Sequence, residues 1–192
     1  MSTSALSPRQ AGATLTELLI AIAVVGVVMG GLTQMFATYR RVYAVQDRVA
    51  GMTQQGQAAF ELISREVRAA GSNPTGATFT AVAYSPTQLE LRSDRNGNGT
   101  TNDANEHVIY AYDATNRRIT RDAGNGVETV AENIQGFTFT YLNSAGATTT
   151  VSSAVRQINL TITARTAVPD PRYKTNGGYR TMNLTSLIAL RN

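Results

Sequence analysis

The sequence predicts an α+β fold in which one long N-terminal helix packs on a C-terminal antiparallel β-sheet head. Three observations support this class. Residues 18–32 form an unbroken run of apolar residues and glycine, and apolar side chains then recur at helical spacing as far as Val67. After Pro74 the chain changes to short β-prone stretches separated by Gly, Asn and Asp. Helical periodicity followed by strand periodicity is the pattern of an α+β protein.

Composition limits the classes of function. The chain has 192 residues, of which 42% are hydrophobic, enough for one medium domain and an anchor. It has no cysteine, which excludes a disulfide framework, a thiolate metal site and a cysteine nucleophile. The 17 basic and 13 acidic residues give a net charge of +4 and are spread along the chain. Because they form no basic stripe, nucleic acid is not an expected partner.

Residues 13–34 are expected to form a transmembrane or filament-core helix. At 1.5 Å per residue, this segment is about 30 Å long, close to the thickness of a bilayer core. A secretory signal peptide is the alternative, but Arg9 is the only cation before the run, and no cleavage site with a polar break follows it. Arg40 and Arg41 beyond the run outnumber Arg9, so charge alone leaves the orientation open.

Residues 35–71 continue the helix as an amphipathic segment. Charged and amide side chains fill one face and apolar side chains the other, as in a helix that packs on a domain. Gly71 and Pro74 are expected to end this helix. We therefore predict one helix from about Thr14 to Ala70. Its apolar positions are Met35, Tyr39, Val42, Val45, Val49, Met52, Ala59, Phe60, Ile63 and Val67.

Glu17 is the one acid in the apolar N-terminal segment, and two roles compete for it. The stretch from Thr14 to Glu17 fits the capping-box pattern, in which a hydroxyl and a carboxylate satisfy free amides at a helix start. Its charge also suits the positive end of the helix dipole. Alternatively, the cost of placing a carboxylate in a membrane makes it a candidate for pairing with a cation of another subunit.

The stretch RQAGATLTELLIAIAVVG resembles the N-terminal processing signal of type IV pilins and type II secretion pseudopilins. The shared features are a short polar leader ending in Gly, a Glu five residues later, and an unbroken apolar helix. The resemblance implies that residues 1–12 are a leader that prepilin peptidase removes by cutting between Gly12 and Ala13. Methylation of the new amine usually follows in this family, although the family usually has Phe where this chain has Ala13.

The same resemblance implies a role for Glu17 and an orientation. The new amine of Ala13 in one subunit is expected to pair with Glu17 of its neighbour, so that a misregistered helix leaves the acid unpaired. The resemblance further implies a pilin fold, with the head outside the inner membrane.

Residues 72–192 are expected to form the β-rich head. Alternation puts Ile158, Leu160 and Ile162 on one face of a strand, and residues 137–141 show the same period. The apolar faces need a cover, which the second half of the helix supplies. The head looks most like those of PilW-type minor pilins and GspJ-type pseudopilins. The expected strands are TFTAVAY, QLELRS, HVIYAYD, RRITR, FTFTYL, VRQINLTITA and MNLTSLIAL.

A loop within residues 94–106 resembles part of a calcium-binding loop. Oxygen-bearing side chains stand at its first, third and fifth positions, and a glycine stands at the sixth. The pattern breaks at the twelfth position, which is Asn105 with Glu106 one step later. A plain polar loop with Asn-Gly turns accounts for the same residues, so both interpretations stay open. The candidate calcium ligands are Asp94, Asn96, Asn98, Asp103 and Glu106.

We expect no enzymatic activity. His107 is the only histidine, and the sequence contains no nucleophile elbow, phosphate loop or zinc-ligand spacing. A lone histidine at the start of an expected strand is typical of a surface or edge position. Arg117, Arg118 and Arg121 are expected on a solvated strand face rather than in a nucleic-acid site.

Together these patterns predict a minor type IV pilin of the PilW type that takes part in initiating or capping pilus assembly. Expected partners are other minor pilins, the major pilin, prepilin peptidase, the inner-membrane assembly platform and membrane lipid. The expected location is the bacterial inner membrane, with a periplasmic head, and then the tip of a pilus or pseudopilus. Alternatives are a GspJ-type pseudopilin, a tip-displayed calcium-dependent adhesin or DNA-uptake subunit, and an unprocessed membrane-anchored domain.

Overall fold

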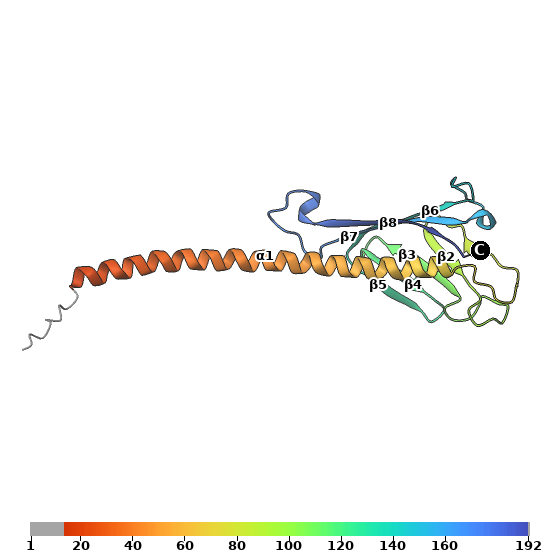
Figure 1. The fold of residues 1–192 in the computed structure, drawn as a ribbon, viewed down its shortest axis with the longest axis horizontal. Coiled ribbons are helices and arrows are strands. Elements are labelled where there is room, and N and C mark those ends of the chain that lie inside the picture. Colours follow the sequence, from red (N-terminus) through yellow and green to blue (C-terminus); the bar gives the residue numbers. More distant parts are fainter. Residues whose placement is uncertain (1–13, 192) are drawn as a thin grey trace, which may run out of the picture. The chain divides into compact units, whose positions relative to one another are not determined.

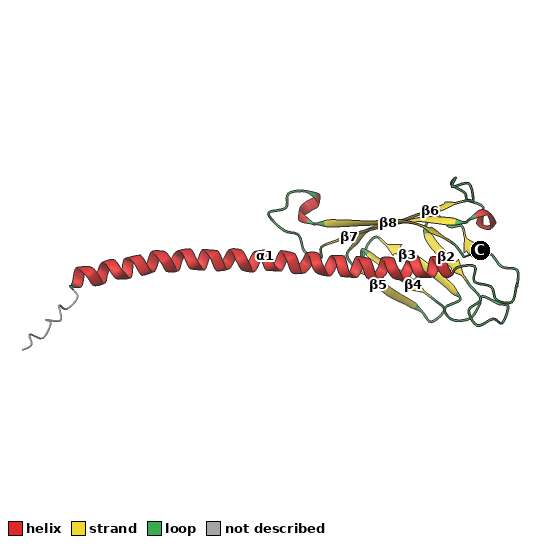
Figure 2. Ribbon diagram, viewed as in Figure 1, coloured by secondary structure: helices red, strands yellow, loops and turns green. Residues whose placement is uncertain are grey.

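The computed structural model describes residues 14–191. One α-helix, α1 (Leu15–Ala69), opens the described chain, and the later elements are strands and two short 3-10 helices (Figure 2). The chain divides into two compact units, residues 1–45 and 46–192. The predicted α+β class is confirmed, and α1 begins and ends next to its predicted bounds.

The part of α1 in the first unit carries the apolar run. Its described residues as far as Ala44 are exposed, including Leu18, Ile20 and Val27. By length and composition, α1 can cross a membrane. At Gly30 and Gly31, a Cβ would have no described atom within 4 Å, so both positions leave room for close approach of another helix.

The part of α1 in the second unit has one buried face. A Cβ on Gly56 would lie 3.0 Å from Met182 Cε and 3.2 Å from Ala164 Cβ, so the absence of a side chain lets the helix approach the sheet closely. The spacing of the buried side chains confirms the predicted amphipathic pattern from Met52 to Val67. The earlier predicted positions Met35, Tyr39 and Val42 are exposed. The buried residues of α1 are Met52, Gly56, Ala59, Ile63, Ser64, Glu66 and Val67.

The helix ends as the sequence predicts. Gly71 has a φ of 83°, in the left-handed region that glycine adopts without a steric cost, and turns the chain out of the helix. Its backbone N–H donates to the carbonyl oxygen of Arg92 at 2.9 Å. This hydrogen bond ties the end of α1 to the end of a strand.

The strands form two antiparallel sheets, where the sequence led us to expect one. The first sheet has the strand order β1-β2-β3-β4-β5, and the second has the order β6-β7-β8. Two 3-10 helices, η1 (Ser152–Ala154) and η2 (Asn176–Gly178), lie in the connections of the second sheet. The strands are β1 (Val82–Ala83), β2 (Gln88–Arg92), β3 (His107–Asp113), β4 (Arg118–Asp122), β5 (Val127–Ala131), β6 (Ile134–Leu142), β7 (Gln157–Arg165) and β8 (Thr181–Ala189).

The chain turns at Asn133 as it passes from one sheet to the other. Asn133, between β5 and β6, has a φ of 55°, in the left-handed region, and the strand that follows it, β6, pairs with β7 and not with β5. Strand β5 was absent from the predicted strands, and in the structure its first three residues, including Glu128, are exposed. Strand β1 is shorter than predicted, since only Val82 and Ala83 pair with β2, opposite Leu91 and Glu90.

Within the second unit, α1 packs between the two sheets (Figure 1). Gly56 faces β7 and β8, while Glu66, ten residues later, is hydrogen-bonded to Tyr110 on β3. The predicted alternation in β7 is confirmed, since Ile158, Leu160 and Ile162 are fully buried. The helix and both sheets therefore share one core.

Candidate functional site

The described chain begins with a reciprocal capping box. The carboxylate Oε2 of Glu17 accepts a hydrogen bond from the backbone N–H of Thr14 at 2.8 Å and another from its hydroxyl at 3.0 Å. In return, the Glu17 N–H donates to the Thr14 hydroxyl at 3.4 Å. The predicted capping role of Glu17 is confirmed, because its carboxylate occupies an otherwise free helix-start amide.

The predicted processing residues, Gly12 and Ala13, lie outside the described residues. Thr14 is the first described residue, and its carbonyl oxygen accepts the first helical hydrogen bond, from Leu18 N–H at 3.1 Å. Glu17 is exposed, so its carboxylate is open on the side away from Thr14. Pairing of Glu17 with an amine of another subunit stays a prediction.

The Asp- and Asn-rich loop is organised around Asp94, which is fully buried. Its Oδ1 accepts hydrogen bonds from the backbone N–H groups of Gly97 at 2.7 Å and Asn98 at 3.2 Å. Its Oδ2 accepts from the N–H of Gly99 and from the hydroxyl of Thr75, both at 3.0 Å. Burial by itself raises the pKa of Asp94, but these hydrogen bonds outweigh burial and hold the pKa below its ordinary value. The loop therefore folds around a carboxylate anion.

Glu106 and Asp103 join the same loop. Glu106 is 2% exposed, and its Oε1 accepts from the N–H groups of Arg95 at 2.8 Å and Asn96 at 3.0 Å. Its Oε2 is buried and has no hydrogen-bond partner in the described part of the chain. The Oδ2 of Asp103 lies 2.9 Å from Asn96 Nδ2 and 2.6 Å from Asn98 Nδ2. The structure thus brings the five predicted ligands into one hydrogen-bonded network.

This network meets the requirements of a calcium site only in part. Rotating the amides of Asn96 and Asn98 would put two more oxygens beside Asp103 Oδ2, and calcium prefers such clusters of oxygen. Within residues 14–191, however, no three Asp, Glu, His or Cys side chains gather closely enough to hold a metal ion. The loop has the oxygen chemistry for calcium, and it also closes through its own hydrogen bonds.

His107 takes part in a polar contact at the strand start. Its Nε2 lies 2.9 Å from Oε1 of Glu90, which also pairs with Arg92. The side chain of His107 is 37% exposed. This partly exposed position at the start of β3 is the kind of position that the sequence predicted.

The expectation that the arginine cluster is solvated was wrong for Arg121. Its side chain is only 13% exposed and pairs with Glu66 of α1, with Nη2 2.8 Å from Oε1 and Nε 3.3 Å from Oε2. Tyr110 donates its hydroxyl proton to Glu66 Oε2 at 2.6 Å. The pKa of Tyr110 is raised mainly by burial, and the Glu66 carboxylate raises it further. Arg121 lies two residues from buried Ile119, so strand alternation puts both on the inner face. That spacing was the signal for a buried arginine.

Comparison with known proteins bears on the N-terminal segment. Residues 7–33 match the family model described as the prokaryotic N-terminal methylation motif. The match includes Gly12, Ala13 and Glu17, and it ends one residue beyond the apolar run of residues 18–32. No curated protein matches the chain.

The motif and the fold together define the class of protein. The chain carries the N-terminal signal of prepilins, followed by one long apolar helix whose second half packs on antiparallel strands. Residues 7–33 therefore carry the processing signal found in type IV pilin-like prepilins, a class that takes in both pilins and pseudopilins. The motif is that of filament subunits and favours a structural role over an enzymatic one.

Proposed function

We propose that this protein is a minor type IV pilin of the PilW type, which helps to initiate or cap a pilus together with other minor pilins. The observation that carries the proposal is the methylation motif at residues 7–33, placed at the start of an apolar helix with Glu17 in its first turn. The β-rich second unit supplies a surface for contacts with other subunits.

Maturation and assembly follow from the chemistry of this start. Prepilin peptidase cuts between Gly12 and Ala13, and the freed amine is positively charged at neutral pH. The Ala13 ammonium of one subunit then pairs with Glu17 of a neighbour as the apolar helices leave the lipid and pack together. Because an unpaired charge is costly in an apolar helix bundle, this pair sets the axial register of the subunits.

Before assembly, the protein is held in the inner membrane by the apolar part of α1, with the second unit in the periplasm. After assembly, it lies near the tip of the filament beside other minor pilins and the major pilin. Mass spectrometry of the N-terminus in cells with and without prepilin peptidase tests the processing step. The expected product begins at Ala13; an intact Met1, or a cut elsewhere, would overturn the proposal.

Two variants separate the two roles of Glu17. Glu17→Gln keeps a capping-box side chain but removes the charge, while Thr14→Ala removes the cap hydroxyl and keeps the charge. We expect Glu17→Gln to insert into the membrane normally and to be recovered far less in complexes with other minor pilins. Thr14→Ala should be recovered normally. Equal recovery of the wild type and Glu17→Gln would leave Glu17 with its capping role alone.

The nearest alternative is a GspJ-type pseudopilin of type II secretion, which shares the motif and the helix. The two functions differ in the machine that the subunit joins. Deleting the gene and measuring surface pili and secreted enzymes in the same cells distinguishes them. Loss of pili with intact secretion supports the pilin assignment, and the opposite result supports the pseudopilin.

A second candidate function is binding of calcium by the Asp94–Glu106 loop, favoured by the buried, unpartnered Oε2 of Glu106. Binding would require the carboxylates of Asp94, Asp103 and Glu106, which do not gather closely enough in the present loop, to close on the ion. Asn96 and Asn98 would add amide oxygens. The bound ion would brace the loop, as a displayed calcium-dependent adhesin requires.

Thermal unfolding of the full chain in nanodiscs, with chelator and then with about 1 mM calcium, tests this site. We expect calcium to raise the midpoint and Asp103→Asn to abolish the rise. The matched control is Glu128→Gln, because Glu128 is an exposed acid on β5, outside the loop. This variant should respond to calcium as the wild type does. An unchanged midpoint, or an equal rise in Asp103→Asn, would remove calcium from the function.

A further inference from the structure

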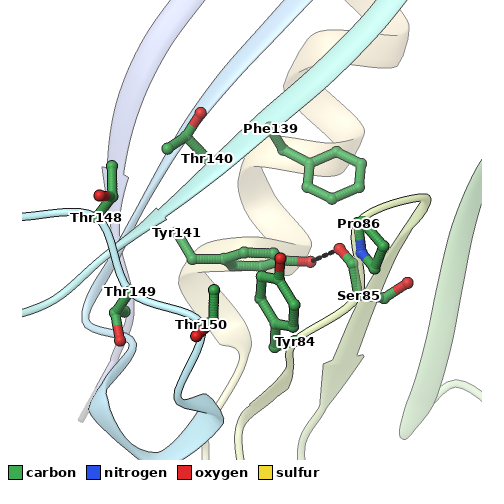
Figure 3. A pocket seen from close by; sticks show the side chains of 9 residues that line it. All are labelled: Tyr84, Ser85, Pro86, Phe139, Thr140, Tyr141, Thr148, Thr149 and Thr150. Atoms are coloured by element: carbon green, nitrogen blue, oxygen red, sulfur yellow. Dashed lines mark hydrogen bonds between the residues drawn. The ribbon is translucent and has the colours of Figure 1, made fainter.

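A small cavity opens between the two sheets of the second unit. It has a volume of about 300 Å³, at the lower end of the range for ligand pockets. One side is the turn between β1 and β2, with Tyr84, Ser85 and Pro86. Another is the end of β6, and a third is the loop of residues 148–150 that leads toward η1 (Figure 3).

Three aromatic rings shape this cavity. The ring of Tyr141 lies between those of Tyr84 and Phe139 (Figure 3). Its centroid is 5.4 Å from that of Tyr84 and 5.6 Å from that of Phe139, with interplanar angles of 61° and 66°. The rings therefore stand edge to face and form a corner. Tyr84 is 40% exposed, so it is open to a ligand.

The corner is held rigid by hydrogen bonds from both sheets. The hydroxyl of Tyr141 lies 3.2 Å from the carbonyl oxygens of Ser85 and of Gln88, to which it donates. The backbone N–H of Tyr84 donates to Ser152 Oγ of η1 at 2.9 Å. Because these contacts fix the rings before anything binds, little ordering cost remains for a ligand.

Hydroxyl groups line the opposite side. Thr148 and Thr150 border the cavity and are exposed, and their hydroxyls make no hydrogen bond within the described part of the chain. Thr140 also borders the cavity, but its side chain lies on the face of β6 opposite to Phe139 and Tyr141 (Figure 3). Each hydroxyl can both donate and accept a hydrogen bond. All nine residues that line the cavity are uncharged. The cavity thus offers aromatic surface and adaptable hydroxyls, without a charge to attract an ion.

We infer that this cavity is a binding site for a neutral saccharide, with one pyranose ring seated in the aromatic corner. A pyranose has an apolar face of C–H groups and an edge of hydroxyls, which match the ring of Tyr84 and the threonine hydroxyls respectively. A charged sugar acid or a phosphate finds no countercharge here. This site is independent of the calcium loop and of the machine that the subunit joins.

Saturation-transfer difference NMR on the full chain tests the inference, because it detects weak ligands of large particles. The chain is placed in nanodiscs, since glycoside detergents would themselves compete for the site. The probes are the methyl glycosides of glucose, galactose and N-acetylglucosamine, and a proline-rich peptide as the alternative ligand of an aromatic groove. We expect saturation of the C–H face of at least one glycoside.

Variants assign the signal to the cavity. Tyr84→Ala should weaken binding about fivefold or more, as loss of one aromatic contact does. Tyr84→Phe keeps the ring and should retain binding, and Tyr173→Ala, an aromatic residue outside the cavity, is the matched control. Circular dichroism confirms that each variant is folded. Absence of saturation for all three glycosides, the same signal in Tyr84→Ala as in the wild type, or binding of the peptide alone would overturn the inference.

Discussion

The ion pair between Arg121 and Glu66 is expected to be the strongest single attachment of α1 to the first sheet. Replacing Arg121 with Met keeps much of the side-chain volume but leaves the Glu66 carboxylate, 7% exposed, with the Tyr110 hydroxyl as its remaining partner. Removing one partner of a buried pair costs about 3–5 kcal/mol, because the other charge stays desolvated. In a domain of this size, each kcal/mol shifts the melting temperature by about 2–4 °C, which gives a fall of about 10 °C.

The assay is thermal unfolding followed by circular dichroism of the full chain in nanodiscs, completed as a double-mutant cycle with Glu66→Gln. The double variant has no buried charge, and Gln still accepts from Tyr110, so it should recover most of the lost stability. The expected coupling between the two positions is about 2 kcal/mol or more. A fall below about 2 °C for Arg121→Met, or additive single effects, would refute the conclusion that Arg121 neutralises a buried Glu66.

Three further predictions concern other parts of the chain. Gly56→Val should destabilise the second unit by about 1–3 kcal/mol in unfolding experiments, since its side chain would enter the packed contact with Ala164 and Met182; the control Gly51→Ala, with no atom near its new Cβ, should stabilise it by about 0.5–1 kcal/mol. Hydrogen bonds from the side chain and backbone of Asn116 lower the pKa of Asp113 to about 2. Desolvation opposes this shift, and Arg118 adds to it. The stabilising effect of Asp113 should therefore be complete above about pH 4 and be lost as the pH falls toward 2; NMR titration should show Asn116→Ala raising this pKa, and an unchanged value would contradict the assignment. Tyr110→Phe should cost about 1.5–3 kcal/mol, the value of a hydrogen bond to a charged group, whereas Tyr112→Phe removes only a bond to the Ile134 carbonyl and should cost less.

The sequence predicted most of the helix because each of its signals is local. Three signals act within one or two helical turns. They are the helical spacing of apolar residues from Met52 to Val67, the capping box at Thr14 and the glycine at position 71. The same holds for β7, where a period of two is enough to identify Ile158 and Leu160 as core residues. These features require no knowledge of what lies opposite them.

The sheet arrangement could not be predicted because it depends on non-local pairing. The residues of β5 and β6 do not indicate that the two strands, on either side of the left-handed turn at Asn133, belong to different sheets. The pairing of Glu66 with Arg121 could not be predicted either, because the two residues are 55 positions apart along the chain. The spacing was enough to select Asp94 and the other candidate ligands, which share one hydrogen-bonded loop. It could not show that backbone amides already occupy the oxygens of Asp94.

The capping box at the start of α1 bears on how maturation affects the fold. Its hydrogen bonds join atoms of Thr14 and Glu17 alone, and the first helical bond joins Thr14 to Leu18. A cut between Gly12 and Ala13 therefore breaks none of the hydrogen bonds that residues 14–191 make at this helix start. The proposed proteolysis would therefore leave the described helix start intact, with Ala13 as the one residue before it.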